Sequence, residues 1–125
     1  DEGGGHTTTL DIHGDDNTLT GYQRNGNLNA YNGHTATLYL YGDNQTLHAV
    51  QEADGAKTLN YTSTVDGTIG NIRQAHNGAH TATVVLNCTY PTNITLLQNS
   101  STAQSYSIAQ NCVTVGGCTV SVTQE

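Results

Sequence analysis

The segment HTATLYLYGDNQTLHAVQ, residues 34–51, decides the fold of this 125-residue chain. Apolar and polar residues alternate in its first half, and a period of two places successive side chains on opposite faces of a strand. The turn signal GDNQ at residues 42–45 follows, and a second alternating run ends on Gln51. The segment therefore predicts a strand, a turn and a second strand, each strand with one buried face.

The same pattern occurs five times, at residues 6–23, 34–51, 57–74, 80–98 and 104–124, after a short flexible segment at residues 1–5. A lone hairpin is marginally stable in water, whereas stacked repeats bury one continuous core. We therefore expect one all-β domain over residues 6–125. Its predicted architecture is a β-solenoid, or cross-β stack, of five strand-turn-strand repeats with two facing sheets.

The composition fits a thin core. The chain has no Trp, Phe or Met, and two sheets packed about 10 Å apart need only one layer of small and medium side chains from each. The predicted apolar core consists of Leu10, Ile12, Leu38, Leu40, Leu59, Tyr61, Val84, Leu86, Ile108, Val120 and Val122. The predicted turn positions are Gly14, Asn17, Gly42, Gly67, Pro91, Gly116 and Gly117.

Every repeat ends in a glutamine, and the intervals between these glutamines are 28, 23, 24 and 26 residues (Gln23, Gln51, Gln74, Gln98 and Gln124). A buried amide left unpaired costs about 1 to 3 kcal/mol. If identical glutamines stack at the strand spacing of about 4.8 Å, each amide can donate to the next, as in cross-β assemblies. We expect an interior ladder; the alternative is that each glutamine ends its strand at the surface.

The second repeat resembles the curlin repeat of the bacterial proteins that assemble curli amyloid fibres, through Gly33, Gly42, Gln45 and Gln51 in the layout GHTATx4GDNQTx4Q. In the first repeat, Gly14, Asn17 and Gln23 match the family's Gly, Asn and final Gln, whereas the family's first Gln is kept only at Gln110. The resemblance covers residues 6–124. It implies a structural subunit of a secreted functional-amyloid fibre for biofilm matrix and adhesion, with copies of itself, a nucleator or secretion machinery as partners.

The end repeats point the same way. A solenoid leaves unpaired backbone groups at its first and last strands, and natural monomers block such edges with caps, prolines or charges. No charged cap follows the last repeat, and DEGGG at residues 1–5 is short, so we expect end-to-end addition of further subunits. A monomer whose long connection at residues 24–33 folds over an edge is the alternative.

The sequence lacks the signals that are typical of other functional classes. The net charge of −7, with Arg24, Lys57 and Arg73 as the only Lys or Arg residues, argues against nucleic acid as a partner. No apolar run approaches the ~20 residues that span a bilayer, so we expect no membrane insertion. A start at Asp1, without a methionine or an apolar leader, favours a processed, secreted form. Paired carboxylates, a Ser-His-Asp order and phosphate-binding loops are absent, so we expect neither an enzyme nor a cofactor.

Three cysteines lie in the last two repeats. Cys112 and Cys118 flank the final turn, where a disulfide would staple the hairpin. The alternative pair is Cys88 with Cys112, which share one offset in successive repeats. In-register stacking would place their Cα atoms about 4.8 Å apart, within the range of about 4.4 to 6.8 Å that disulfides accept. Either pairing leaves one thiol.

Histidines open three repeats. His6 and His34 could stack, but Lys57 interrupts the column before His80, and no CxxC or HExxH spacing occurs. We therefore expect surface polar positions and no metal site.

Threonine pairs mark the outward face of the first strands, with TxT at residues 7–9, 35–37 and 81–83. Flat TxT arrays look like those of ice-binding β-solenoids, although Thr is also favoured on exposed strands in general. The alternative function is thus a monomeric solenoid that binds ice or carbohydrate through this Thr-rich face.

Overall fold

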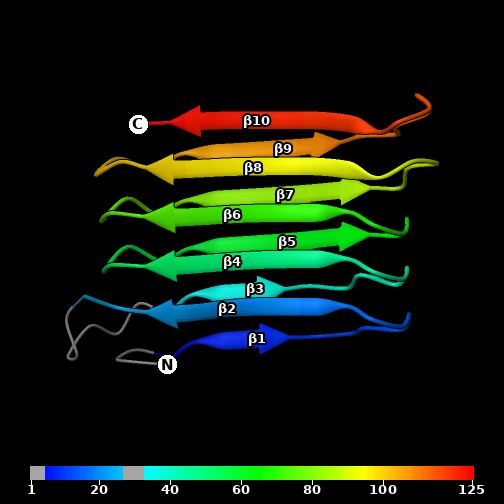
Figure 1. The fold of residues 1–125 in the computed structure, drawn as a ribbon. Helices are drawn as coiled ribbons and strands as arrows, with labels where there is room; N and C mark the ends of the chain where they lie inside the picture. The colour runs from blue at the N-terminus through cyan, green and yellow to red at the C-terminus, as the bar shows by residue number, and fades with distance from the viewer. Residues whose placement is uncertain (1–4, 27–32) are drawn as a thin grey trace.

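The computed structural model describes residues 5–26 and 33–125, which form an all-β solenoid of stacked coils (Figure 1). A coil is one strand-turn-strand repeat, and the coils are numbered 1 to 5 along the chain. Coil 1 holds β1 (Thr7–Thr9) and β2 (Thr18–Arg24); coil 2, β3 (Thr35–Thr37) and β4 (Thr46–Glu52); coil 3, β5 (Thr58–Ser63) and β6 (Ile69–Ala75); coil 4, β7 (Thr81–Leu86) and β8 (Thr92–Asn99); coil 5, β9 (Ser105–Ala109) and β10 (Cys118–Gln124). The segment predicted over residues 1–5 lies outside the described residues, except for Gly5.

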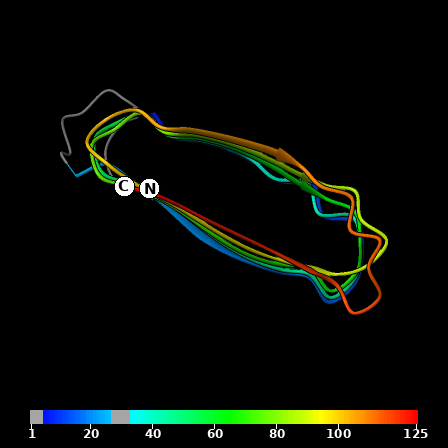
Figure 2. The ribbon, with the colours of Figure 1, turned by 90° about the horizontal axis from the view of Figure 1, so that it is seen from above.

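The two strands of each coil belong to different sheets. One five-stranded sheet has the order β1-β3-β5-β7-β9 and the other β10-β8-β6-β4-β2. All neighbours within a sheet are parallel and in register, so that Leu59 pairs with Ala82 and Gln51 with Gln74. Viewed along the stack, the coils superimpose as a flattened loop (Figure 2). The predicted five-coil solenoid with two facing sheets is confirmed.

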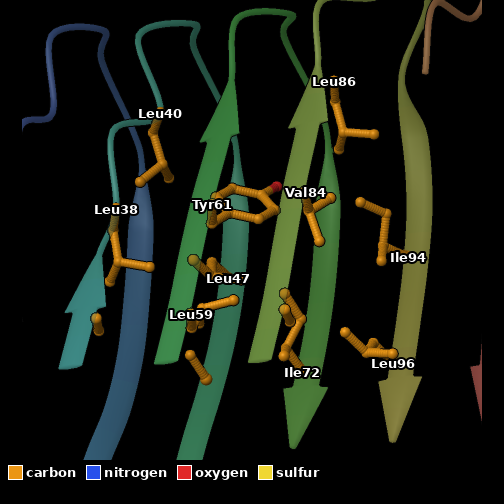
Figure 3. Close-up of a cluster of buried hydrophobic side chains, with 13 residues drawn as sticks. Leu38, Leu40, Leu47, Leu59, Tyr61, Ile72, Val84, Leu86, Ile94 and Leu96 are labelled. Carbon is orange, nitrogen blue, oxygen red and sulfur yellow. The ribbon is translucent and has the colours of Figure 1, made fainter. Parts of the chain in front are cut away.

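The core is a single layer of side chains from each sheet. Figure 3 shows Leu59, Tyr61, Val84 and Leu86 of β5 and β7 between the two sheets, and all four side chains are buried. Leu38 and Leu40, just beyond β3, are also buried, as predicted. Alternation of apolar and polar residues therefore decides which face of each strand enters the core.

The predicted core is wrong at the first coil. Leu10 and Ile12 are 52% and 42% exposed. Coil 1 is a terminal coil with edge strands, so an inward side chain has neighbours on one side only. Ile108, Val120 and Val122 are partly buried against the core at the other end, for the same reason.

All seven predicted turn positions lie in the connections between the two strands of a coil. Asn17 Nδ2 donates to Gly14 O at 3.0 Å. Gly14 is required by close stacking, because a Cβ atom there would lie 2.3 Å from Gly42 O in the next coil. Gly67, Gly116 and Gly117 have positive φ angles of 71°, 97° and 92°, and Pro91 directly precedes β8, outside the strand ladder.

Candidate functional site: the interior polar columns and the two ends of the solenoid

The five repeat-ending glutamines form one continuous column. Each Nε2 donates to Oε1 of the glutamine in the next coil, over 2.8 Å from Gln23 to Gln51, 2.9 Å from Gln51 to Gln74, 2.8 Å from Gln74 to Gln98 and 2.8 Å from Gln98 to Gln124. The first four side chains are buried, and Gln124 is partly exposed. The structure thus places these residues as the interior ladder that their spacing predicted, and the surface alternative is wrong for the first four.

The same amides also join the two sheets. The second Nε2 hydrogen of Gln51, Gln74 and Gln98 donates across the coil to a backbone carbonyl at the start of the first strand, over 2.9, 3.0 and 3.1 Å (Thr35, Thr58 and Thr81). Both amide hydrogens are therefore used, one along the stack and one across it. A shift of register by one residue would leave these buried donors unpaired.

A second polar column lies beside the ladder, where the chain enters each coil. His34, Lys57 and His80 are 0%, 0% and 1% exposed, so the prediction of surface positions is wrong for the two histidines. Their side chains turn inward because carbonyl groups at the end of the preceding strand need donors: His34 Nε2 bonds Arg24 O at 3.1 Å, and His80 Nε2 bonds Ala75 O at 2.8 Å. Lys57 Nζ donates to Gly55 O in the same corner.

This column is also linked along the stack. The backbone N–H of His34 donates to His6 Nδ1 at 3.0 Å, and the N–H of Lys57 donates to His34 Nδ1 at 3.2 Å. In its neutral form, His34 therefore uses both ring nitrogens, Nε2 as a donor and Nδ1 as an acceptor. Burial lowers the pKa of His34 to about 4 and that of Lys57 to about 8, and it also lowers the pKa of His80. Sequence reasoning recognised the recurring position but missed the burial of its side chains.

Within residues 5–26 and 33–125, no group of three His, Cys, Asp or Glu side chains is placed to hold a metal ion. The described residues also contain no helix that is long and apolar enough to cross a membrane.

A disulfide closes the last coil. Cys112 and Cys118 are bonded, with their Cα atoms 5.9 Å apart, across the turn before β10. The preferred pairing is confirmed and the alternative pair, Cys88 with Cys112, is wrong. Cys88 is a free thiol that donates to Gln110 O at 3.3 Å and accepts from Thr92 Oγ1 at 3.4 Å.

The two ends of the solenoid carry edge strands. β1 and β2 are the edges at one end, and β9 and β10 are the edges at the other (Figure 1). Within the described residues, the ladder ends at Gln23 and at Gln124, each of which has a glutamine neighbour on one side only. Gln23 Oε1 accepts from Thr8 Oγ1 in its own coil, whereas Gln124 Nε2 donates to Ser105 O over a longer 3.3 Å, and no further coil among the described residues receives it.

The outward face carries rows of threonine in register. Thr7 pairs with Thr35, Thr35 with Thr58 and Thr58 with Thr81, and Ser105 continues the row in β9. The segment that follows β3 carries aromatic side chains instead. The ring centroids of Tyr39 and Tyr41 lie 5.9 Å apart, and the rings are stacked with an interplanar angle of 7°.

Comparison of the chain with protein-family models, with curated proteins and with solved structures finds no match in any of the three. The geometry of the columns and of the ends therefore carries the functional argument.

Proposed function

We propose that the protein is a structural subunit of a secreted extracellular fibre, of the curli-like functional-amyloid kind, that grows by end-to-end stacking of solenoids. The observation that supports this proposal is the direction of the glutamine ladder. Every ladder bond runs from Nε2 of one coil to Oε1 of the next, so one end offers a donor at Gln124 and the other an acceptor at Gln23.

The backbone supports the same contact. Stacking β1 of a second copy on β9, and β2 on β10, would repeat the parallel, in-register pairing that already joins coils 4 and 5. Such a contact uses different surfaces on the two copies, and a heterologous contact that does not close into a ring produces a filament. Exposed edge strands favour this kind of addition because their N–H and C=O groups are unpaired.

The ladder also gives the contact its register. A buried amide without a partner costs about 1 to 3 kcal/mol, so a copy added one residue out of register would be penalised at the glutamine as well as along the core. Matched polar columns are the feature that cross-β assemblies use for in-register stacking.

The test is assembly of the purified, disulfide-intact protein at neutral pH. Because identical copies with a net charge of −7 repel one another, the assay is run at about 0.15 M salt, where the Debye length is about 8 Å. We expect filaments by electron microscopy, with reflections near 4.7 to 4.8 Å along the fibre axis and near 10 Å across it. Protein that remains monomeric in salt and after seeding would refute the proposal.

The register row of Thr7, Thr35, Thr58 and Thr81 favours a second candidate, a monomer that binds ice or carbohydrate through this face. The two functions depend on different side chains, those of the interior glutamines for the fibre and those of the outward threonines for surface binding. Substitution of ladder glutamines by leucine should slow fibre growth and leave a surface-binding activity intact. Substitution of the exposed Thr81, which lies in the inner strand β7, by lysine should do the reverse.

A further inference from the structure

The solenoid has an underpacked core at one end. A cavity of about 260 Å³ lies between the two sheets at coils 1 and 2. Its walls include Thr8 and Ala36 from one sheet and Gly21 and Ala49 from the other, with Leu59 of coil 3 beyond them.

The cavity follows from the residues that occupy two columns. In the first sheet, strand register aligns Thr8, Ala36, Leu59, Ala82 and Tyr106. In the second sheet, it aligns Gly21, Ala49, Ile72, Leu96 and Val122. Coils 1 and 2 contribute only small side chains to both columns, whereas coil 3 contributes Leu59 and Ile72. The missing volume is therefore confined to the end that carries β1 and β2.

At the opposite end of the solenoid, the column that begins with Thr8 ends in a large side chain, that of Tyr106. Tyr106 lies in the edge strand β9, packs against the core from one side and is only partly buried. A second copy that continued the strand register would set its Thr8 directly over Tyr106, because Thr8 and Tyr106 are the first and last members of one column. The tyrosine ring would then lie next to the coil that contributes Thr8 and Gly21 to the cavity wall.

We infer that this cavity is a socket for the side chain of Tyr106 from a second copy of the chain. The inference rests on the proposed fibre function and names the contact that selects the partner and sets its direction. The occupant is a second copy because the cavity and the ring belong to one register column, at the two ends that the ladder direction makes complementary.

The size of the cavity suits the ring. A dry, apolar cavity of about 150 Å³ binds benzene, so about 260 Å³ has room for a phenol. The chain already contains such a pair inside its core, where the buried ring of Tyr61 lies opposite Gly70, and a Cβ atom on Gly70 would be 3.5 Å from the tyrosine hydroxyl. In the socket, Gly21 would leave room for the ring of Tyr106 as Gly70 does for the ring of Tyr61.

The polar lining suits the hydroxyl group. A buried tyrosine needs a hydrogen-bond partner for its O–H. Thr8, Gln23 and Gln51 all line the cavity. The Thr8 hydroxyl donates to Gln23 Oε1, and its oxygen can accept a hydrogen bond from a tyrosine O–H. The socket thus combines an apolar body with a polar edge, as a phenol requires.

The test uses one variant for each end. Tyr106→Ala removes the ring, and Ala49→Ile fills the socket with the residue type that Ile72 places in the same column of the next coil. Each variant should elongate wild-type seeds at least tenfold more slowly than wild-type protein does, which corresponds to about 1.4 kcal/mol. Tyr106→Phe keeps the ring but loses the hydroxyl, so it should elongate faster than Tyr106→Ala and more slowly than wild-type protein. The outer-face variant Tyr41→Ala should elongate close to the wild-type rate.

Monomer stability separates this result from misfolding. Because Ala49→Ile fills a void, its monomer should unfold at a temperature no lower than that of the wild type. Each variant also keeps one intact end, since Ala49→Ile retains Tyr106 and Tyr106→Ala retains the open socket. An equimolar mixture should therefore form 1:1 heterodimers in sedimentation velocity, whereas each variant alone stays monomeric.

The outcomes distinguish the socket from the fibre. Wild-type filaments together with wild-type elongation by both variants, or a mixture without heterodimers, would overturn the socket and leave the fibre proposal standing. A wild-type protein that never assembles would overturn both. A monomer that binds p-cresol in this cavity but does not assemble would reassign the cavity to a small aromatic ligand.

Discussion

Replacement of Gln74 by leucine tests the ladder in the monomer, independently of any assembly. Gln74 is fully buried in the middle coil and takes part in three hydrogen bonds. Its Nε2 donates to Gln98 Oε1 at 2.8 Å and to Thr58 O at 3.0 Å, and Gln51 Nε2 donates to its Oε1 at 2.9 Å. Leucine is similar in size and can make none of these bonds.

The expected magnitude follows from these contacts. Three hydrogen bonds at a net value of about 1 kcal/mol each give about 3 kcal/mol, and an acceptor left buried on Gln98 adds about 1 to 3 kcal/mol. The apolar leucine side chain returns about 1.5 to 3 kcal/mol through its own burial. We therefore expect Gln74→Leu to lower the free energy of unfolding by about 1 to 4.5 kcal/mol.

Gln124→Leu is the matched control. Gln124 is partly exposed, its bond to Ser105 O is 3.3 Å long, and water can replace its ladder bond, so the expected loss is below about 1 kcal/mol. The assay is urea unfolding of dilute, disulfide-intact monomer followed by circular dichroism. Equal stability of wild type, Gln74→Leu and Gln124→Leu would refute the idea that the ladder stabilises the fold.

Three further predictions concern other parts of the solenoid. Burial holds the pKa of His34 at about 4 in the folded protein against an ordinary 6.5, so its contribution to stability is complete above pH 6.5 and is lost as the pH falls toward 4. The loss is at most about 3 kcal/mol. His34→Gln should abolish this decrease when the free energy of unfolding is measured against pH. A variant with the same pH dependence as the wild type would contradict the role of His34. Joint replacement of Cys112 and Cys118 by alanine should lower the free energy of unfolding in urea by about 2 kcal/mol, since the disulfide closes a short loop in the unfolded chain, and no change would exclude that role. Leu86→Ala, at a fully buried site, should cost about 2 to 5 kcal/mol in the same assay, whereas Leu10→Ala, at a site 52% exposed, should cost less than about 1 kcal/mol; equal losses would contradict the end-coil explanation.

The repeating part of this structure could be predicted from sequence because every repeat meets the same constraints. Alternation of apolar and polar residues selects the buried face of each strand, and a glutamine that recurs at an inward position has a partner in the coils above and below it. The disulfide was predictable as well, because Cys112 and Cys118 flank one short turn.

Other features depend on position within the stack, which a repeat pattern does not encode. Leu10 follows the same alternation as Leu38 but lacks a neighbouring coil on one side. His34 and Lys57 carry polar side chains that simple hydropathy assigns to the surface, whereas the coil corners supply carbonyl acceptors that make burial favourable. The cavity depends on which small residues face one another across the core, and that becomes visible only when both strand registers are known.

Because the coils stack in register, a whole coil can be removed without disturbing the alignment of the others. Successive coils keep every column aligned although their spacings differ between 23 and 28 residues, so the connections absorb the differences and the strands do not. Removal of residues 57–79 would join Ala56 to His80, seat His80 on His34 and Gln98 on Gln51, and leave a four-coil protein with all columns intact. In nearest-neighbour terms the chain would lose one coil and one coil interface. We expect the shortened chain to fold cooperatively with a lower free energy of unfolding. This result would mean that the solenoid can be shortened one complete coil at a time.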